Sequence, residues 1–436
     1  MESYSQSQTA KVAWLGKIPK HWKEKRAKYF FKELDVRSES GTEEMLSVSH
    51  ITGVTPRSEK KVTMFLSETN IGQKKCQPGD LVINTMWAWM AALGIAKHDG
   101  IVSPSYGVYR PINKHEFNPV YLDLLLRIEG YRTEFYCNST GIRSSRLRLY
   151  PDKFLSIPII CPPLEEQNKI VNYLNWKLSK INNFIKAKRE LTSLIEERRN
   201  ILTNKAIFDS STKEMRLQFI VEQIKRPVNR MNSKIYTPIG LYNRGRGIFV
   251  KPKTQGKELG DSSFFWIEEG DLVLSGQFAW EGAVSIATEN EHGCIASHRY
   301  PILRGHNKLV KTSFLWAFFQ TKLGYLLLNT HSKGAAGRNR PLNIRTLLKE
   351  KIPVPSIKLQ NEIVEITKQE KLLKSEVKQL ENLLIEYKAR LISDLVTGKI
   401  DVRTIQLPDF NHNDAYMDIT TEESIAEEQF IEVSEE

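Results

Sequence analysis

The feature of this sequence that most constrains its fold is an internal repeat with a period of about 190 residues. Short segments recur in the same order and at a nearly constant offset, which makes the set more informative than any single match. The matched pairs are Gly79–Val82 with Gly270–Val273, Ala88–Trp89 with Ala279–Trp280, Ser103, Tyr106 and Arg110 with Ser297, Tyr300 and Arg304, Ile157–Pro158 with Ile352–Pro353, Gln167–Val171 with Gln360–Val364, and Leu194–Glu196 with Leu384–Glu386. The chain is therefore predicted to contain two copies of one architecture.

Each copy begins with a mixed segment that is rich in Gly, Pro and aromatic residues. Short apolar runs at 81–83 and 272–274 follow Gly-Asp turns and predict β-strands. Helical stretches are expected at 119–127 and 313–328. These patterns predict an α+β globular domain in each copy.

A long helix is predicted after each globular domain, over about 164–205 and 358–396. Apolar residues of the second helix alternate steps of three and four with a polar break at Glu370, a seven-residue repeat typical of a coiled coil. Prolines mark both beginnings, and Gly398 marks the second end. The residues predicted at the seam are Leu174, Ile181, Leu191, Ile195, Ile363, Ile366, Leu373, Val377, Leu380, Leu384 and Leu391.

The predicted order is thus domain, helix, domain, helix and tail. The boundaries are a first globular domain at 1–160, a first spacer helix at 161–206, a second globular domain at 207–355, a second spacer helix at 356–400 and an acidic tail at 401–436. Helices of about 40 residues span roughly 60 Å. If they pair as an antiparallel coiled coil, one domain lies near each end, about a pseudo-twofold axis.

The charge is distributed unevenly between the body and the tail. All 63 Lys and Arg but only 41 of the 51 Asp and Glu lie in residues 1–408, so that the body carries +22 and the whole chain +12. A basic body favours a polyanion partner. The acidic end is expected to be a solubilising tail, with competition against the polyanion for the basic surface as the sharper hypothesis.

Composition also excludes several classes of protein. No run approaches the ~20 apolar residues of a membrane span, and the polar first ten residues lack the apolar core of a signal peptide. The four cysteines are far apart, which fits reduced thiols in a cytoplasmic protein and not a disulfide scaffold or zinc ribbon.

Four segments resemble the specificity (S) subunit of type I restriction-modification systems, over about residues 12–405. They are the opening at 14–22 (Trp-Leu-Gly-Lys-Ile-Pro-x-x-Trp), the Ser-Pro-Ser-Tyr segment at 101–106, the helix entry at 162–167 (Pro-Pro-Leu-Glu-Glu-Gln) and the helix exit at 395–402. The second copy departs from this pattern at 297–300 and 355–360, which leaves the subtype and target of its domain in doubt but not the architecture.

The resemblance implies a non-catalytic DNA-recognition subunit. Such a subunit reads a bipartite sequence with one target-recognition domain per half-site, and its paired helices set the spacer between the half-sites. It binds no cofactor itself. Its expected partners are double-stranded DNA, two methylation (M) subunits that use S-adenosylmethionine, and restriction (R) subunits that join through them and use ATP and Mg.

Candidate DNA contacts are basic and polar residues near turns, because Arg and Lys suit phosphates and guanine, and Asn suits adenine. The strongest candidates lie in two loops at equivalent places, and they are Arg143, Ser144, Ser145, Arg146, Lys333, Arg338, Asn339 and Arg340. Weaker candidates, equally consistent with a solvated face, are Arg57, Lys60, Lys61, Lys74, Lys75, Arg244, Arg246 and Lys251. Tyr106 and Tyr300 face either DNA or core, whereas Trp87, Trp89 and Trp280 are interpreted as core.

Two other classes of function remain open. The chain lacks a Gly-x-x-x-x-Gly-Lys-Ser/Thr phosphate loop, a His-Glu-x-x-His metal motif and the Asn/Asp-Pro-Pro-Tyr/Phe segment of amino-methyltransferases. The alternatives are a stand-alone nuclease or methyltransferase with an unfamiliar site, and a coiled-coil RNA-binding protein.

Overall fold

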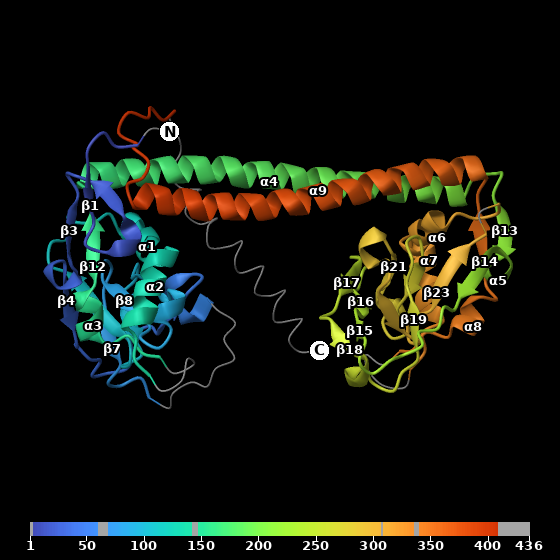
Figure 1. Ribbon diagram of the computed structural model, residues 1–436, viewed down its shortest axis with the longest axis horizontal. Helices are drawn as coiled ribbons and strands as arrows, with labels where there is room; N and C mark the ends of the chain where they lie inside the picture. Colours follow the sequence, from blue (N-terminus) through green and yellow to red (C-terminus); the bar gives the residue numbers. More distant parts are fainter. Residues whose placement is uncertain (1–2, 60–68, 142–146, 307, 335–339, 409–436) are drawn as a thin grey trace. The chain divides into compact units, whose positions relative to one another are not determined.

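The computed structural model describes residues 3–59, 69–141, 147–306, 308–334 and 340–408. It divides into two compact units (Figure 1), of which unit 1 comprises Met1–Lys186 and Leu380–Glu436, and unit 2 comprises Ala187–Gln379. Both units combine short strands, short helices and parts of two long helices.

A four-stranded antiparallel sheet forms the centre of each unit. In unit 1 the order is β4 (Phe31–Leu34), β11 (Gly107–Pro111), β8 (Leu81–Ile83) and β9 (Leu93–Ile95). In unit 2 the order is β14 (Val221–Ile224), β23 (Ile302–Gly305), β20 (Leu272–Leu274) and β21 (Val284–Ile286). The same chain order and the same pairing recur, so the predicted duplication is confirmed in the fold.

Smaller antiparallel pairs are repeated as well. The pair of β3 (Lys23–Arg26) with β12 (Pro158–Cys161) in unit 1 corresponds to the pair of β13 (Lys213–Arg216) with β24 (Lys351–Val354) in unit 2. The pair of β7 (Lys74–Cys76) with β10 (Gly100–Val102) corresponds to that of β19 (Phe264–Trp266) with β22 (Ile295–Ser297). The hairpin of β5 (Leu46–Ser49) and β6 (Gly53–Pro56) corresponds to that of β16 (Ile239–Leu241) and β17 (Ile248–Val250). Two pairs differ between the units: β1 (Ser7–Thr9) with β2 (Lys17–Pro19) in unit 1, and β15 (Ile235–Tyr236) with β18 (Thr254–Gln255) in unit 2.

Short helices pack on these sheets. They are α1 (Pro119–Arg127), α2 (Glu129–Asn138) and α3 (Pro151–Ser156) in unit 1, and α5 (Leu217–Ile220), α6 (Thr312–Phe319), α7 (Lys322–Thr330) and α8 (Ile344–Leu347) in unit 2. The single helix expected over 313–328 is two helices. The break occurs at Thr321, whose hydroxyl accepts a hydrogen bond from the Gly324 amide and caps α7.

A buried aspartate fixes the turn before each central strand. The Asp80 carboxylate accepts hydrogen bonds from Nε and Nη2 of Arg110, both at 2.8 Å. The Asp271 carboxylate accepts hydrogen bonds from Nε of Arg304 at 2.6 Å and from Nη1 of Arg226 at 2.7 Å. Both carboxylates are almost fully buried, at 1% and 0% exposure, so they require these charged partners. The sequence repeat of Gly-Asp and Arg therefore encodes one structural device twice.

The long helices α4 (Leu164–Ile207) and α9 (Ile357–Val396) pair antiparallel within each unit. In unit 1, Lys388 of α9 contacts Asn182 of α4, and Lys169 of α4 reaches the Arg403 carbonyl beyond α9. The contacts in unit 2 follow the same antiparallel order: Lys374 of α9 donates a hydrogen bond to Glu196 of α4 at 3.1 Å, and Arg199 of α4 donates one to Glu370 of α9 at 2.6 Å. Residue numbers rise along one helix as they fall along the other, which confirms the antiparallel pairing.

The seam differs from the predicted one in α4. Buried seam residues are Leu174, Ile181, Ile363, Ile366, Val377 and Leu391, and half-buried ones are Ile195, Leu373, Leu380 and Leu384. Leu191 was predicted there wrongly, because it is 42% exposed and the adjacent Thr192 lies on the buried side. Leu194 is 61% exposed whereas Leu384 is half-buried, so the identity of Leu194–Glu196 with Leu384–Glu386 does not match residues of equal burial.

The polar break at Glu370 is a buried ion pair. Glu370 is 1% exposed and binds Arg199, which is also 1% exposed. The Arg199 guanidinium lies 4.6 Å from the ring centre of Trp316, and Lys374 Nζ binds the second carboxylate oxygen of Glu370 at 2.7 Å. A charged residue can occupy the seam because each charge has a partner.

One buried glutamine joins each long helix to its globular domain. The Gln167 side chain accepts from the Asn118 amide at 2.7 Å and donates to the Glu116 and Pro162 carbonyls at 2.9 and 2.8 Å. Gln360 repeats this pattern with Lys311, Leu309 and Pro355.

Gln360→Ala is expected to lower the free energy of unfolding by about 2–4 kcal/mol, because it leaves a buried amide and two carbonyls without their partner. Chemical denaturation measures this. Glu362→Ala, at an exposed position on the same helix, is the control and should change stability by less than about 0.5 kcal/mol. An equal effect of both variants would contradict the proposed role of Gln360.

Unit 1 is completed by the segment that follows α9. Gly398 has a φ of 75° and lies against Pro19 and Trp22, where a Cβ would fall 2.5 Å from Pro19 Cδ. The Tyr121 hydroxyl also donates to the Val396 carbonyl at 2.8 Å. The two segments at opposite ends of the family resemblance, 14–22 and 395–402, therefore pack together.

Candidate nucleic-acid interface

The stems of the two predicted DNA-contacting loops are anchored in the same way in both units. Thr140 forms a β-bridge with Arg148 in unit 1, and Ser332 forms one with Leu342 in unit 2. Next to each bridge, the Leu149 amide donates to the Thr85 carbonyl and the Leu342 amide donates to the Gly276 carbonyl, both at 2.8 Å. Each loop stem is thus fastened to the chain just beyond β8 in unit 1 and β20 in unit 2.

Several predicted contact residues lie outside the described part of the chain. These are Arg143, Ser144, Ser145, Arg146, Arg338, Asn339, Lys60 and Lys61. The described members of the two loops include Lys333, which is exposed, and Arg340, which is half-buried.

Arg340 lies on an aromatic ring of unit 2. Its guanidinium is 4.9 Å from the ring centre of Trp280, in the short helix η7 (Ala279–Glu281). Trp280 is only half-buried, so its ring also has a part outside the core, where Arg340 contacts it. A guanidinium stacked on a ring is held in one orientation and keeps its edge available for hydrogen bonding. This pair is therefore suited to contact a base edge or a phosphate.

The β16–β17 hairpin adds basic residues beside η7. Its tip carries Arg244 and Arg246, both exposed, and the Arg244 amide donates to the Glu281 carbonyl at 2.8 Å. Lys251 follows the second strand, and its ammonium lies 5.8 Å from the Phe249 ring centre. The structure thus brings together two separate groups of predicted residues, the hairpin and the loop that ends at Arg340.

Unit 1 presents an aromatic surface at the equivalent place, around the short helix η4 (Ala88–Met90). Trp87 is 50% exposed and Tyr136 is 52% exposed, so the interpretation of Trp87 as core is wrong. Trp87 is exposed because it precedes η4, where Ala88 is the residue that enters the core. Trp89 packs edge-on to Tyr136, with ring centres 6.5 Å apart.

Sequence reasoning missed Arg148 and Tyr150 on this surface. The Arg148 guanidinium lies 5.9 Å from the ring centre of Tyr150, which is 45% exposed. Arg148 forms the bridge at the stem of the loop, at the place that Leu342 holds in unit 2, two residues beyond Arg340. The signal was the basic run that continues from 143 to 148, of which only the first part was chosen.

Two predicted lysines of unit 1 have carboxylate partners instead. Lys74 is 7% exposed in β7 and lies 3.9 Å from Glu33 and 3.8 Å from Asp35, so the phosphate contact predicted for it is wrong. Lys75 Nζ lies 2.7 Å from Glu43 Oε1. Hydrogen bonds from Lys75 and Ser38 lower the pKa of Glu43 to about 2, and the Lys75 charge is balanced locally.

Tyr106 and Tyr300 occupy equivalent half-buried turns. The Tyr106 and Tyr300 amides donate to the Ser103 and Ser297 carbonyls at 3.0 and 2.9 Å. The Tyr106 hydroxyl accepts from Asn84 at 3.1 Å, and burial raises its pKa although the nearby Arg57 opposes the shift. Both rings pack against core residues, which makes their structural role the primary one.

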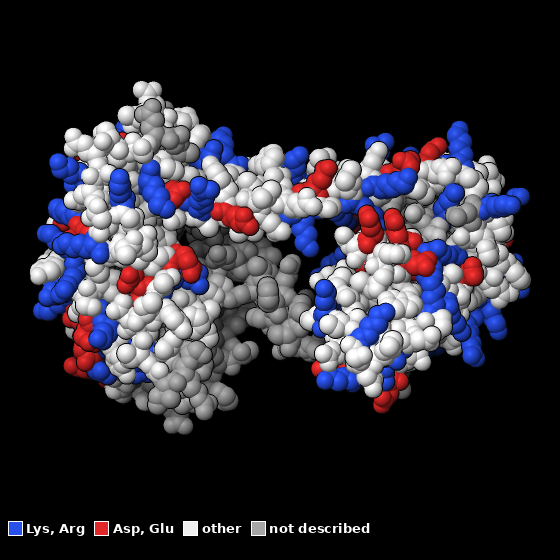
Figure 2. Space-filling model, in the orientation of Figure 1, with Lys and Arg blue, Asp and Glu red and all other residues white. Residues whose placement is uncertain are grey.

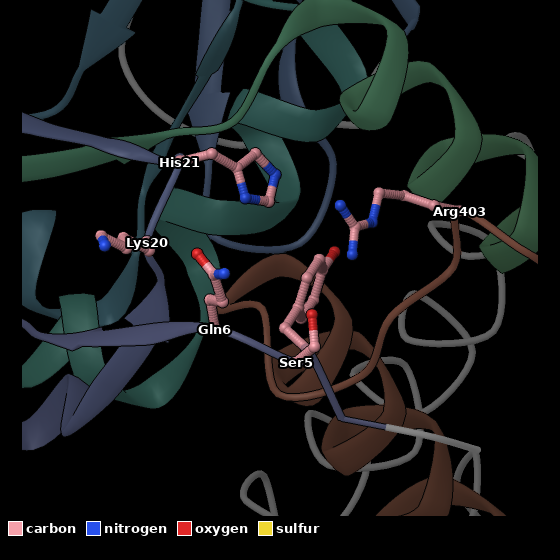
Figure 3. Close-up of a pocket in the computed structure, with 6 residues that line it drawn as sticks. Ser5, Gln6, Lys20, His21 and Arg403 are labelled. Carbon is pink, nitrogen blue, oxygen red and sulfur yellow. The ribbon is translucent and has the colours of Figure 1, made fainter.

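A pocket of about 350 Å³ lies at the junction of the N-terminal segment with the segment after α9. Figure 3 shows His21 and Arg403 approaching it from these two segments. His21 binds the buried Glu166 at 2.7 Å, and Arg403 binds Asp401 at 2.6 Å and holds the pKa of that carboxyl below its usual value. Because its charges are balanced in this way, we interpret the pocket as a structural junction.

Figure 2 shows Lys and Arg spread over the visible face of both units, with smaller acidic groups between them. Among the described residues, no group of three or more His, Cys, Asp or Glu is placed to hold a metal ion. The described helices include none that is long and apolar enough to cross a membrane.

Comparison with known proteins gives one family and twelve similar solved chains, two of which are described here. The family model for the type I restriction modification DNA specificity domain matches residues 25–194 and 222–385. A chain from a study of complex assembly and conformational transition in the type I R-M system has 16% identity and a TM-score of 0.57, over 88% of this chain and 99% of that one. The HsdS subunit from Thermoanaerobacter tengcongensis has 16% identity and a TM-score of 0.50, over 88% and 98%. No curated protein matches the chain.

Proposed function

The chain belongs to the family of type I restriction modification DNA specificity domains, and from this we propose that it reads a bipartite DNA target with one half-site for each unit. The observation that supports the proposal is that the repeat of the family match agrees with the repeat of the fold. The family model matches twice, and the two matches cover the two copies of one sheet, one loop stem and one aromatic turn.

Each unit has the parts that DNA reading requires. Phosphate contacts supply affinity that depends on salt, and contacts to base edges supply sequence preference. Arg148 with Tyr150 in unit 1 and Arg340 with Trp280 in unit 2 place a guanidinium beside a ring at the foot of each loop. We assign these pairs, with the loops they flank, to the DNA-facing surface of each unit.

We further propose that α4 and α9 set the spacer between the two half-sites. Both helices are continuous through the boundary between the units, and they pair antiparallel on either side of it. A helix pair with a regular seam resists bending and stretching, whereas a loop would not. Spacing between half-sites then follows from protein geometry.

The partners and cofactors are proposed on the same basis. We propose that the chain docks methylation subunits that use S-adenosylmethionine and, through them, restriction subunits that use ATP and Mg, and that it carries no catalytic site of its own. The similar chain from the study of complex assembly in a type I R-M system supports this, since the likeness covers 99% of its length.

The test is to co-express the chain with its methylation subunit and to map methylated sites across a genome. A bipartite motif with a fixed spacer is expected. Methylation of DNA by the purified chain alone would favour the stand-alone methyltransferase. Preference for RNA over duplex DNA in a competition assay would favour the RNA-binding alternative.

Arg340→Ala is expected to weaken reading of the second half-site by about 5-fold to 30-fold, since an arginine contact to DNA contributes roughly 1–2 kcal/mol. Binding to duplexes with one altered half-site measures this. Arg148→Ala is the matched variant of unit 1 and should weaken only the first half-site. Loss at both half-sites from either variant would contradict the assignment of one half-site to each unit.

A further inference from the structure

The β5–β6 and β16–β17 hairpins occupy equivalent places but end in different tips. Met45 forms a parallel bridge with Ile101, and Pro238 forms one with Ile295, so the first strands of the two hairpins start from matching positions. Leu46 and Val48 enter the core of one sheet as Ile239 and Leu241 enter the other. The two tips can therefore be compared directly.

The tip of unit 1 is short and carries neither Arg nor Lys. The tip is His-Ile-Thr at 50–52. The nearby Arg127 is bound within the unit, because its Nη1 donates to the His50 carbonyl at 2.6 Å and its Nε donates to Asp123 at 2.9 Å. The tip of unit 2 is longer, Tyr-Asn-Arg-Gly-Arg-Gly at 242–247. The β16–β17 tip thus has two arginines that the β5–β6 tip lacks.

The basic tip is held in place by its neighbours. The Arg244 and Gly245 amides donate to the Glu281 and Gly282 carbonyls, both at 2.8 Å, and the Asn243 side chain donates to the Glu281 carboxylate. These bonds fix the tip to η7, the helix whose Trp280 carries Arg340. The hairpin tip and Arg340 are therefore both held against η7.

Arg244 has an unusual backbone. Its φ is 57°, in the left-handed region that favours glycine, and among the described non-glycine residues only Ala91 shares this sign. Left-handed arginine is retained only where its surroundings enforce it, and such residues cluster at functional sites. The hydrogen bonds to η7 hold the Arg244 backbone in this conformation.

The Arg246 guanidinium is oriented by two contacts within the tip. Its guanidinium lies 5.3 Å from the ring centre of Tyr242, and its Nε donates to the Asn243 carbonyl at 3.1 Å. This bond uses Nε and not the two terminal amino groups. A fork of two donors on a planar, oriented group matches the O6 and N7 acceptors of guanine in the major groove.

We propose that the tip 242–247 is a second reading element of unit 2, in which Arg246 specifies a guanine of the second half-site and Arg244 contacts the adjoining DNA. The β5–β6 tip, at 50–52, offers no counterpart to this contact. This inference rests on the proposed function, because it assumes that unit 2 reads DNA.

The experiment compares Arg246→Ala, Arg246→Lys and Lys213→Ala, each co-expressed with the methylation subunit. Lys213 is an exposed lysine on β13 and serves as the control. In Arg246→Ala the preference at one position of the second half-site is expected to relax by about tenfold or more, and the first half-site stays unchanged. Arg246→Lys should not restore the preference, because a single ammonium cannot form the fork.

The outcomes separate this inference from the proposed function. A wild-type map without a bipartite motif would overturn the proposed function itself. A normal wild-type map with an identical map and methylation rate for Arg246→Ala would overturn only the role of the tip. Recovery of full base preference in Arg246→Lys would overturn the guanine fork. Equal thermal unfolding of all variants would establish that lost reading does not reflect lost folding.

Discussion

Glu370→Leu is expected to lower the free energy of unfolding of unit 2 by about 3–5 kcal/mol, because it leaves Arg199 buried without its closest carboxylate. The guanidinium would keep its contact with the Trp316 ring, 4.6 Å away, and with a carboxylate oxygen of Glu196, 3.8 Å away. Glu196 is half-buried. Chemical denaturation, followed by the loss of helical signal, measures the change.

The double variant Arg199→Met with Glu370→Leu should recover most of the loss, since it replaces both charges with apolar side chains of similar length. Glu365→Ala is the control on the same helix, because Glu365 forms an exposed ion pair with Lys368 at 2.9 Å. Its effect should stay within about 0.5 kcal/mol. Equal losses from the single and double variants would show that the cost comes from packing and not from the unpaired charge.

Lengthening both long helices by seven residues is expected to lengthen the spacer of the DNA target by about three base pairs. Repeating 183–189 in α4 and 375–381 in α9 places the insertions midway between the Asn182–Lys388 and Glu196–Lys374 contacts. Seven residues add roughly 10 Å to a helix and keep the seven-residue phase of the seam. Ten ångströms corresponds to about three base pairs at 3.4 Å each.

A methylation map of the lengthened protein measures the spacer directly. The control adds seven Gly and Ser residues after Asp209, in the connection between α4 and β13, which leaves both helices at their natural length. That control should keep the original spacer. An unchanged spacer in the lengthened protein would refute the assignment of spacing to the helices.

The architecture was predictable because it depends on patterns that repeat along the chain. Gly-Asp turns, Gln167 and Gln360 recur as identical residues, and the steps of three and four in α9 are periodic. The α4 seam was harder to predict, since it passes through Lys188, Thr192 and Arg199, which apolar periodicity does not detect. A buried charge is predicted only when its partner on the other helix is known.

The candidate site was predictable in part for a similar reason. The loops could be found from their basic composition and equivalent positions, but a basic run does not reveal which lysines face carboxylates, as Lys74 and Lys75 do. Arg246 and Arg340 are far apart in sequence, and only η7 relates them. Such groupings arise from tertiary contacts and leave no periodic signal.

The closing contact of Gly398 on Pro19 and Trp22 has a consequence for synthesis on the ribosome. Every residue of unit 2 lies between 187 and 379, whereas unit 1 combines residues up to 186 with residues from 380 onward, which are translated after unit 2. The face of α4 that shares a core with the end of α9, at Leu174 and Leu178, therefore lacks this partner until the end of α9 has emerged. During this interval chaperones, or a second nascent chain, can occupy the face that the end of α9 later covers.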